Sequence, residues 1–75
     1  MVQAYILINL NTPNLSDTMK QLKTVKGIKN ANAVIGPYDC IAELEAGSMD
    51  ALGDVVVDKI LKVDGVAKTL TCVKL

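Results

Sequence analysis

Three acidic side chains, Asp39, Glu43 and Glu45, recur at odd-numbered positions in the middle of the chain. If this segment is a β-strand, residues of one parity lie on one face and the three carboxylates share a surface. Paired carboxylates can perform general acid–base catalysis. The chain has no histidine and no arginine, and it offers no nucleophile beside a base. We therefore interpret the acids as a solvated or interfacial stripe and predict that the protein is not an enzyme.

The segment Gly36-Pro37-Tyr38-Asp39 is the second candidate for chemistry. Glycine and proline favour a tight bend between antiparallel strands, and a purely structural hairpin would account for both. The same segment displays a phenol and a carboxylate beside free backbone N–H groups. Together these groups could hold a zwitterion, with Asp39 binding an ammonium group and backbone amides binding a carboxylate. Both interpretations remain open at this point.

Length and composition bound the remaining possibilities. The chain has 75 residues, enough for one small domain (residues 1–75), and 51% of them are apolar. So small a domain is marginal by itself, and we assign its surplus apolar surface to a partner interface. Eight basic residues balance eight acidic ones, unlike the basic face of a nucleic-acid-binding protein. Because no signal peptide and no apolar run of about 20 residues is present, we expect a cytoplasmic protein. Because the chain has no histidine and its two cysteines are far apart, we expect no cofactor or metal.

The chain contains an internal repeat. The segment Val25-Lys26-Gly27-Ile28 has a similar counterpart, Val63-Asp64-Gly65-Val66, 38 positions later. Apolar or alternating runs predict strands at 4–10, 28–35, 38–45 and 66–75. Helical spacing predicts two helices, which begin near Asn14 and Ser48 and each end at a glycine. Gly53, inside the second helix, is expected to allow close backbone packing. The expected inward-facing residues are Leu15, Met19, Leu22 and Val25 in the first helix and Leu52, Val56, Ile60 and Val63 in the second.

The predicted order βαββαβ is that of a ferredoxin-like α+β sandwich, in which a four-stranded antiparallel sheet carries two helices on one face. Right-handed crossovers place the first and third strands at the centre of the sheet. The other face then exposes apolar residues of the first strand, either Tyr5 and Leu7 or Ile6 and Ile8. Since a monomer rarely exposes such a patch, we predict dimerisation by packing of sheet on sheet. Glu43 and Glu45 then need lysine partners, water or a partly open interface.

The cysteines Cys40 and Cys72 are predicted to be free, buried thiols. In the predicted order the first strand separates their strands by two spacings, about 10 Å. A disulfide needs Cα atoms within about 7 Å. A metal site would require more ligands, and the chain lacks the Cys-x-x-Cys motif of a ferredoxin-like copper chaperone.

Over essentially its whole length, the chain resembles the effector-binding (RAM) domain of the Lrp/AsnC regulators. The matching segments are Ala4-Tyr5-Ile6-Leu7-Ile8, the two repeated helix ends, Thr69-Leu70-Thr71, and Gly36-Pro37-Tyr38-Asp39, which is similar to the family's Gly-x-Tyr-Asp turn. The resemblance implies dimers packed through their sheets and rings of four or five dimers, that is, octamers or decamers. It also implies that amino-acid effectors bind near this turn, between neighbouring dimers. Transferred residue by residue, the ligand-binding candidates are Gly36, Tyr38, Asp39, Thr69 and Thr71.

The sequence departs from the family's pattern in two places. The regulators carry a helix-turn-helix domain ahead of this one, whereas here Met1 stands almost at the first predicted strand. In this respect the chain is similar to stand-alone RAM proteins, for which direct operator binding is not expected. Pro37 replaces the polar residue often found at its turn position and removes one backbone donor, which affects the identity of the ligand.

These observations leave three functional hypotheses. The first is a non-catalytic, oligomeric module that binds an amino-acid effector and acts by mixing with a full-length Lrp/AsnC regulator. The alternative is a pure protein–protein interaction module, in which the turn serves assembly and binds no small ligand. The third is a small ring-forming enzyme, such as an isomerase, with a pocket bounded by Glu43 or Glu45, and the absence of histidine disfavours it.

Overall fold

The computed structural model describes residues 1–75 and confirms the βαββαβ order. The elements are β1 (Val2–Leu10), α1 (Leu15–Thr24), β2 (Ile28–Ala33), β3 (Cys40–Ala46), α2 (Met49–Val55), the π-helical turn η1 (Val56–Ile60) and β4 (Val66–Val73). β2 and β3 are shorter than predicted from the sequence, because residues 34–39 leave the sheet. The backbone N–H of Val34 donates to the carbonyl of Asp39 at 2.9 Å and closes this segment into a turn.

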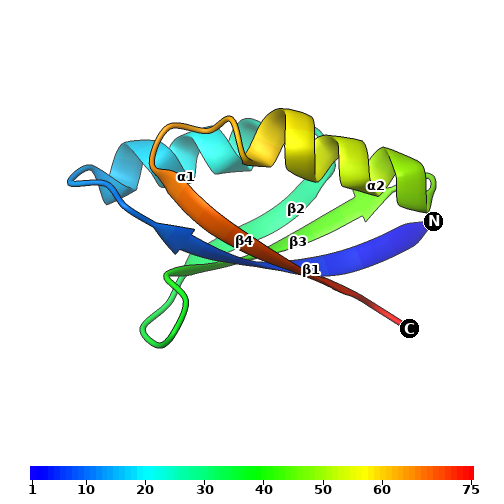
Figure 1. Ribbon diagram of the computed structural model, residues 1–75, viewed down its shortest axis with the longest axis horizontal. Coiled ribbons are helices and arrows are strands. Elements are labelled where there is room, and N and C mark those ends of the chain that lie inside the picture. Colours follow the sequence, from blue (N-terminus) through cyan, green and yellow to red (C-terminus); the bar gives the residue numbers. More distant parts are fainter.

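The four strands form one antiparallel sheet in the order β2-β3-β1-β4. The first and third strands are therefore central, as predicted. Figure 1 shows α1 and α2 together on one side of the sheet. The connection between β2 and β3 projects at one end of the molecule, and both termini lie towards the other end. No helix of the structure combines the length and the hydropathy needed to cross a membrane.

The side of the sheet that faces the helices is buried. Ala4, Ile6 and Ile8 of β1 are buried there, while Tyr5 and Leu7 between them are only half-buried. Cys40, Ala42 and Leu44 of β3 and Ala31 of β2 complete the strand side of this core. The sequence alone left the choice of parity open because β1 is apolar at both parities. The structure assigns Ile6 and Ile8 to the core and Tyr5 and Leu7 to the uncovered face.

The inward face of α1 differs from the predicted stripe. Leu22 is buried and Met19 and Val25 are partly buried, but Leu15 is 45% exposed. Thr18 occupies the buried position instead, and its hydroxyl donates to the carbonyl of Asp64 at 3.1 Å. The prediction for Leu15 was wrong because the first helical turn extends past the end of the core. The helix begins as predicted at Asn14, whose side chain accepts from the N–H of Asp17.

The second helix confirms its predicted stripe, since Leu52, Val56 and Ile60 are buried. Their four-residue spacing suits the wider π-helical turn, which the N–H of Leu61 closes by donating to the carbonyl of Val56 at 2.9 Å. The expectation for Gly53 was wrong, because a Cβ at this position would meet no atom within 4 Å. Gly53 is therefore a helix-interior glycine without a packing reason.

Gly27 and Gly65 close the two halves of the repeat in the same way. Both have a φ of +100°, a conformation that costs other residues energy. The carbonyl of Gly27 accepts from the N–H of Glu45 at 2.9 Å, and that of Gly65 accepts from the N–H of Asn11 at 2.8 Å. A Cβ on Gly65 would lie 2.7 Å from the hydroxyl of Thr18, and one on Gly27 would lie 2.8 Å from the carbonyl oxygen of Glu45. Each glycine is required both by its backbone angle and by a close approach.

Gly65 is required by its backbone angle and a close approach, whereas Gly53 has no packing reason, and a pair of substitutions tests this difference. We expect Gly65→Ala to lower the free energy of unfolding by more than about 1 kcal/mol, because it adds strain and a clash. We expect Gly53→Ala to raise it by up to about 1 kcal/mol, because alanine favours an exposed helix interior. Urea denaturation of both variants measures the two changes, and changes of the same sign would contradict the assignment.

Candidate functional site

The turn formed by residues 34–39 is held against the end of β1 by three interactions. The N–H of Asp39 donates to the carbonyl of Ile8 at 2.9 Å. Oδ2 of Asp39 accepts from the N–H of Leu10 at 2.8 Å. The side-chain amide of Asn9 donates to the carbonyl of Pro37 at 3.0 Å. Asp39 therefore extends the pairing of β3 with β1 by one more position, with a carboxylate in place of a backbone carbonyl.

Several polar groups of the turn have no partner within the chain. Oδ1 of Asp39 and the hydroxyl of Tyr38 make no hydrogen bond, although both residues are partly buried. The backbone N–H groups of Ile35, Gly36 and Tyr38 are also unpaired. A carboxylate oxygen and a cluster of free amides thus lie within one short turn. This combination has the complementary charges that a zwitterion requires.

A hollow of about 230 Å³ opens beside Asp39. Its other walls come from the end of β1, the start of α1 and the end of β2, namely Leu10, Thr12, Leu15, Ala33 and Val34. Sequence reasoning found Asp39 but missed these five residues. The signal available for Leu15 was an apolar residue at the very start of a helix, which periodicity assigned to the core. Its exposure instead gives the hollow an apolar side.

The structure places Gly36, Tyr38 and Asp39 together but separates them from Thr69 and Thr71. Thr69 pairs with Ile8 and Thr71 pairs with Ile6, so both threonines lie on β4, on the helix side of the sheet. Ile8 of β1 also pairs with Cys40 on its other side, so β1 separates Thr69 from the start of β3. Neither threonine lines the hollow beside Asp39. Within one chain, the five candidates do not form a single site.

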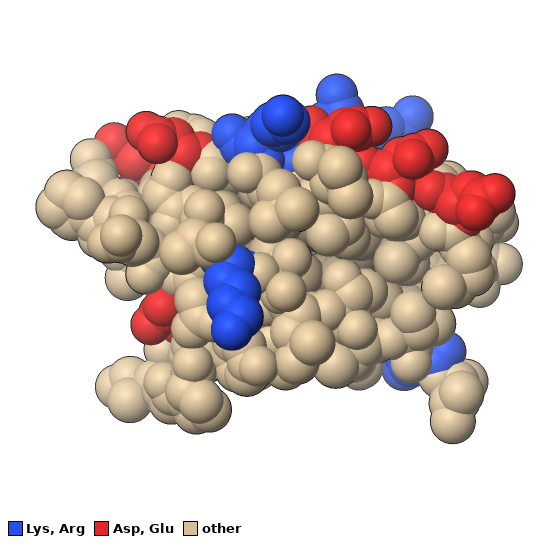
Figure 2. Space-filling model, in the orientation of Figure 1, with Lys and Arg blue, Asp and Glu red and all other residues tan.

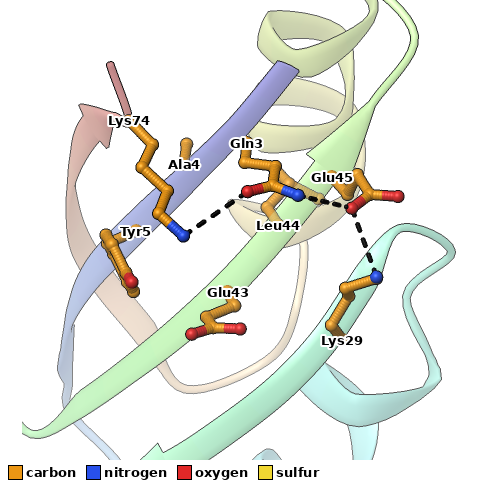
Figure 3. Close-up of a pocket in the computed structure, with 8 residues that line it drawn as sticks. All are labelled: Gln3, Ala4, Tyr5, Lys29, Glu43, Leu44, Glu45 and Lys74. Atoms are coloured by element: carbon orange, nitrogen blue, oxygen red, sulfur yellow. Dashed lines mark hydrogen bonds and ion pairs between the residues drawn. The ribbon is translucent and has the colours of Figure 1, made fainter. Parts of the chain in front are cut away.

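The uncovered face of the sheet carries polar residues at one end (Figure 3). The side-chain amide of Gln3 donates to Oε2 of Glu45 at 3.0 Å, and Lys29 Nζ lies 3.2 Å from the same oxygen. Lys74 Nζ lies 3.5 Å from Oε1 of Gln3 and 5.6 Å from the ring centroid of Tyr5. Glu43 accepts from the amide of Asn30 at 3.3 Å. The expectation that the two glutamates need partners is thus met by one lysine and two amides.

Hydrogen bonds from Gln3 and Lys29 hold the pKa of the Glu45 carboxyl below its ordinary value. A general acid that works near neutral pH needs the opposite shift. The hollow lined by Glu43 and Glu45 holds about 150 Å³ and includes Gln3, Tyr5, Lys29 and Lys74. The surroundings of Glu45 therefore favour a fixed ion pair over proton transfer.

The centre of this face is apolar, and Asn32, Asn9 and Lys68 lie on the same face around it. Ile41, Leu7 and Leu70 lie side by side across β3, β1 and β4, and Tyr5 pairs with Cys72 in the next row. In the view of Figure 2, charged side chains gather mainly over the helical layer, and the sheet side is largely uncharged. This face, which we call the open sheet face, has an apolar centre with polar residues towards both ends, as protein interfaces often do.

Both cysteines are free, as predicted, but only one is buried. Cys40 is fully buried in the core, and this burial raises the pKa of its thiol. Cys72 is exposed, so the prediction of two buried thiols was wrong for this residue. The reason is its parity, since Cys72 pairs with Tyr5 and therefore lies on the open sheet face of an edge strand. No group of three or more potential ligands is placed to hold a metal ion.

A family model described as the Lrp/AsnC ligand binding domain matches residues 3–75. The uncharacterized HTH-type transcriptional regulator PH1916 of Pyrococcus horikoshii is 26% identical over 73 residues, which cover 93% of this chain and 49% of that protein. The chain thus spans about half the length of the curated relatives it matches. Among solved structures, FFRP-DM1 is similar over the whole of both chains, with a TM-score of 0.92 and 28% identity. E. coli AsnC gives a TM-score of 0.91 at 25% identity, over 99% of this chain and 50% of its own.

The ion pair at Glu45 predicts a specific pH dependence of stability. Because the folded state lowers the pKa of Glu45 below its ordinary value of 4.5, the stabilisation is complete above that pH. It is lost as the pH falls through the lower, folded-state pKa. Glu45→Gln should therefore be less stable than the parent near neutral pH, and the difference should shrink under acid conditions.

Urea denaturation across an acidic pH series measures this difference. Lys29→Gln serves as the matched variant, because it removes one cause of the lowered pKa and should weaken the same pH dependence. A Glu45→Gln difference that stays constant with pH would contradict the role of the charge.

Proposed function

Because the chain belongs to the Lrp/AsnC ligand-binding domain family, we propose that it is a non-catalytic module that binds an amino-acid effector at the 34–39 turn. The proposal rests on two features: Asp39, which has a free Oδ1, lines a hollow, and the same turn has three unpaired N–H groups at residues 35, 36 and 38, which do not line that hollow. The carboxylate of Asp39 would bind the ammonium group of the effector, and the backbone amides of the turn would bind the carboxylate of the effector. The hollow walled by Leu15 and Val34 would receive the side chain.

The hollow is shallow in a single chain, and a neighbouring copy would complete it. Leu15 and Val34 are exposed apolar residues on its rim, and covering them would stabilise a contact between dimers. Thr69 and Thr71, which are remote from Asp39 within one chain, would then contribute from another copy or not at all. An effector bound between copies favours one assembly, but only by as much as it binds that assembly more tightly.

The dimer itself would form through the open sheet face. Its apolar row across three strands, Ile41, Leu7 and Leu70, supplies the contact, and the pairs around Glu45 form a polar rim. Dimers would then assemble into an octameric or decameric ring. The regulatory output would come from mixing of these subunits with a full-length Lrp/AsnC regulator.

One observation favours the alternative of a pure assembly module. Three hydrogen bonds already join the turn to β1. They are made by Oδ2 of Asp39, the backbone N–H of Asp39 and the carbonyl of Pro37. The turn thus has a structural role that needs no ligand. The two functions differ in whether the remaining oxygen of Asp39 is used.

A thermal-shift panel of the twenty amino acids tests the leading proposal. The panel includes L-methionine, which the Neisseria meningitidis regulator NMB0573 holds in its crystal structure. An effector at 100 times its dissociation constant should stabilise the fold by about 2.7 kcal/mol. Asp39→Asn keeps an oxygen for the N–H of Leu10 but removes the charge, so the effector should then bind at least about tenfold more weakly.

Asp54→Asn is the matched control, because Asp54 is an exposed acid on α2 outside the hollow. The control should keep the full response. A panel without any selective response, or an Asp39→Asn variant that responds like the parent, would favour the pure assembly module.

The reactivity of Cys72 tests the sheet-on-sheet dimer. Cys72 is exposed in the single chain, whereas Cys40 is buried and the pKa of its thiol is raised. Alkylation of the native protein should therefore modify Cys72 first. Its rate should fall as the protein concentration rises through the dimer range, because the partner sheet covers this thiol.

Two variants make the alkylation test specific. Leu70→Glu places a charge on the open sheet face and should keep Cys72 reactive at every concentration. Leu61→Glu places the same charge at an exposed position after α2 and η1, and should leave the protection intact. Protection that is absent while sedimentation reports a dimer would assign the dimer contact to another face.

A further inference from the structure

A third and larger hollow, of about 410 Å³, lies at the opposite end of β3 from the turn. It opens between the segment after α1, the end of β3 and the length of α2 and η1. The walls that matter for its chemistry are Lys26, Ala46, Gly47, Ala51, Val55 and Lys59. The site is thus a mostly apolar floor with a lysine on either side.

The small residues of this floor are not all required by the fold. Gly27, also in the wall, needs to be glycine because of its φ and the nearby carbonyl of Glu45. Gly47 has no positive φ, and a Cβ there would meet no atom within 4 Å. A larger residue at Gly47 would fit the fold but would narrow the hollow. The space is therefore a feature of the sequence that packing does not explain.

The rim carries more positive than negative charge. Lys29–Glu45 is the one ion pair in the structure, so neither Lys26 nor Lys59 has an acidic partner. Glu45 also borders the hollow; Oε2 of its carboxylate is bonded to Gln3 and Lys29, whereas Oε1 makes no hydrogen bond. An occupant would meet two lysines without an acidic partner, one carboxylate that is already ion-paired, and apolar side chains that include Met1.

We propose that this hollow binds an aliphatic monocarboxylate that carries no ammonium group, such as a short branched fatty acid or 2-oxo acid. The carboxylate lies between Lys26 and Lys59, where charge-assisted hydrogen bonds form. The aliphatic chain lies on Ala46, Ala51 and Val55 and is removed from water. The 34–39 turn offers a carboxylate oxygen and free amides and suits a zwitterion, whereas two unpaired lysines against one ion-paired carboxylate give this hollow a net positive charge. The two sites are independent, and this inference does not rest on the proposed function.

The test is an NMR titration of the protein with sodium 4-methylpentanoate. Saturating shifts are expected for the amides of Gly27, Ala46, Gly47, Ala51 and Val55. The double variant Lys26→Gln/Lys59→Gln should weaken binding at least about tenfold. The double variant Lys20→Gln/Lys62→Gln removes the same net charge from exposed positions outside the hollow and should bind like the parent.

Two further measurements distinguish binding in this hollow from binding at the 34–39 turn. Ala51→Leu fills the hollow without changing charge and should abolish the shifts, while Asp39→Asn should leave them unchanged. L-leucine has the same branched chain plus an ammonium group, and it should bind at least about tenfold more weakly at this site. Equal binding of L-leucine, or equal loss in both lysine double variants, would overturn the proposal.

Discussion

The fold depends on two backbone approaches that only glycine permits. The helical segments end at Thr24 and Ile60, earlier than the predicted glycines, and at Gly27 and Gly65 the chain takes a left-handed conformation. There it comes within hydrogen-bond distance of Glu45 in β3 and of Asn11 just after β1. Each carbonyl therefore ties one strand–helix–strand unit to its counterpart. With both ties in place, β1 and β3 lie side by side at the centre of the sheet, and the two helices can cover only one face.

This arrangement divides the surface into regions of different chemistry. The helix side of the sheet is sealed by Ile6, Ile8 and Leu44, and charged groups gather over the helices beyond it. The other side has an apolar row with polar residues towards both ends. The two ends of β3 carry the concave sites, one beside Asp39 and the other between Lys26 and Lys59. A domain of 75 residues thus has three separate surfaces available for recognition.

The repeat around Gly27 and Gly65 was sufficient to predict the topology, because few folds contain two strand–helix–strand units of this length. The details that the sequence could not supply depend on register. β1 is apolar at both parities, so only the pairing decides which side is buried. Leu15 has the spacing of a core residue, but the core ends before its helical turn. Cys72 is exposed because it pairs with Tyr5. The bond from the N–H of Leu10 to Asp39 joins residues 29 positions apart, which no local pattern encodes.

Asp39 combines a folding contact and a free oxygen in one carboxylate, and this limits how such a protein can change over evolutionary time. A lineage that replaced this acid by a residue without a side-chain oxygen would also lose one of the three interactions that hold the turn against β1. The surrounding wall has no such constraint, because Leu15 and Val34 are exposed and contribute little to the core. New selectivity would therefore arise by exchanging these wall residues around an unchanging acid. Descendants could diverge in what they sense while keeping the same point of attachment.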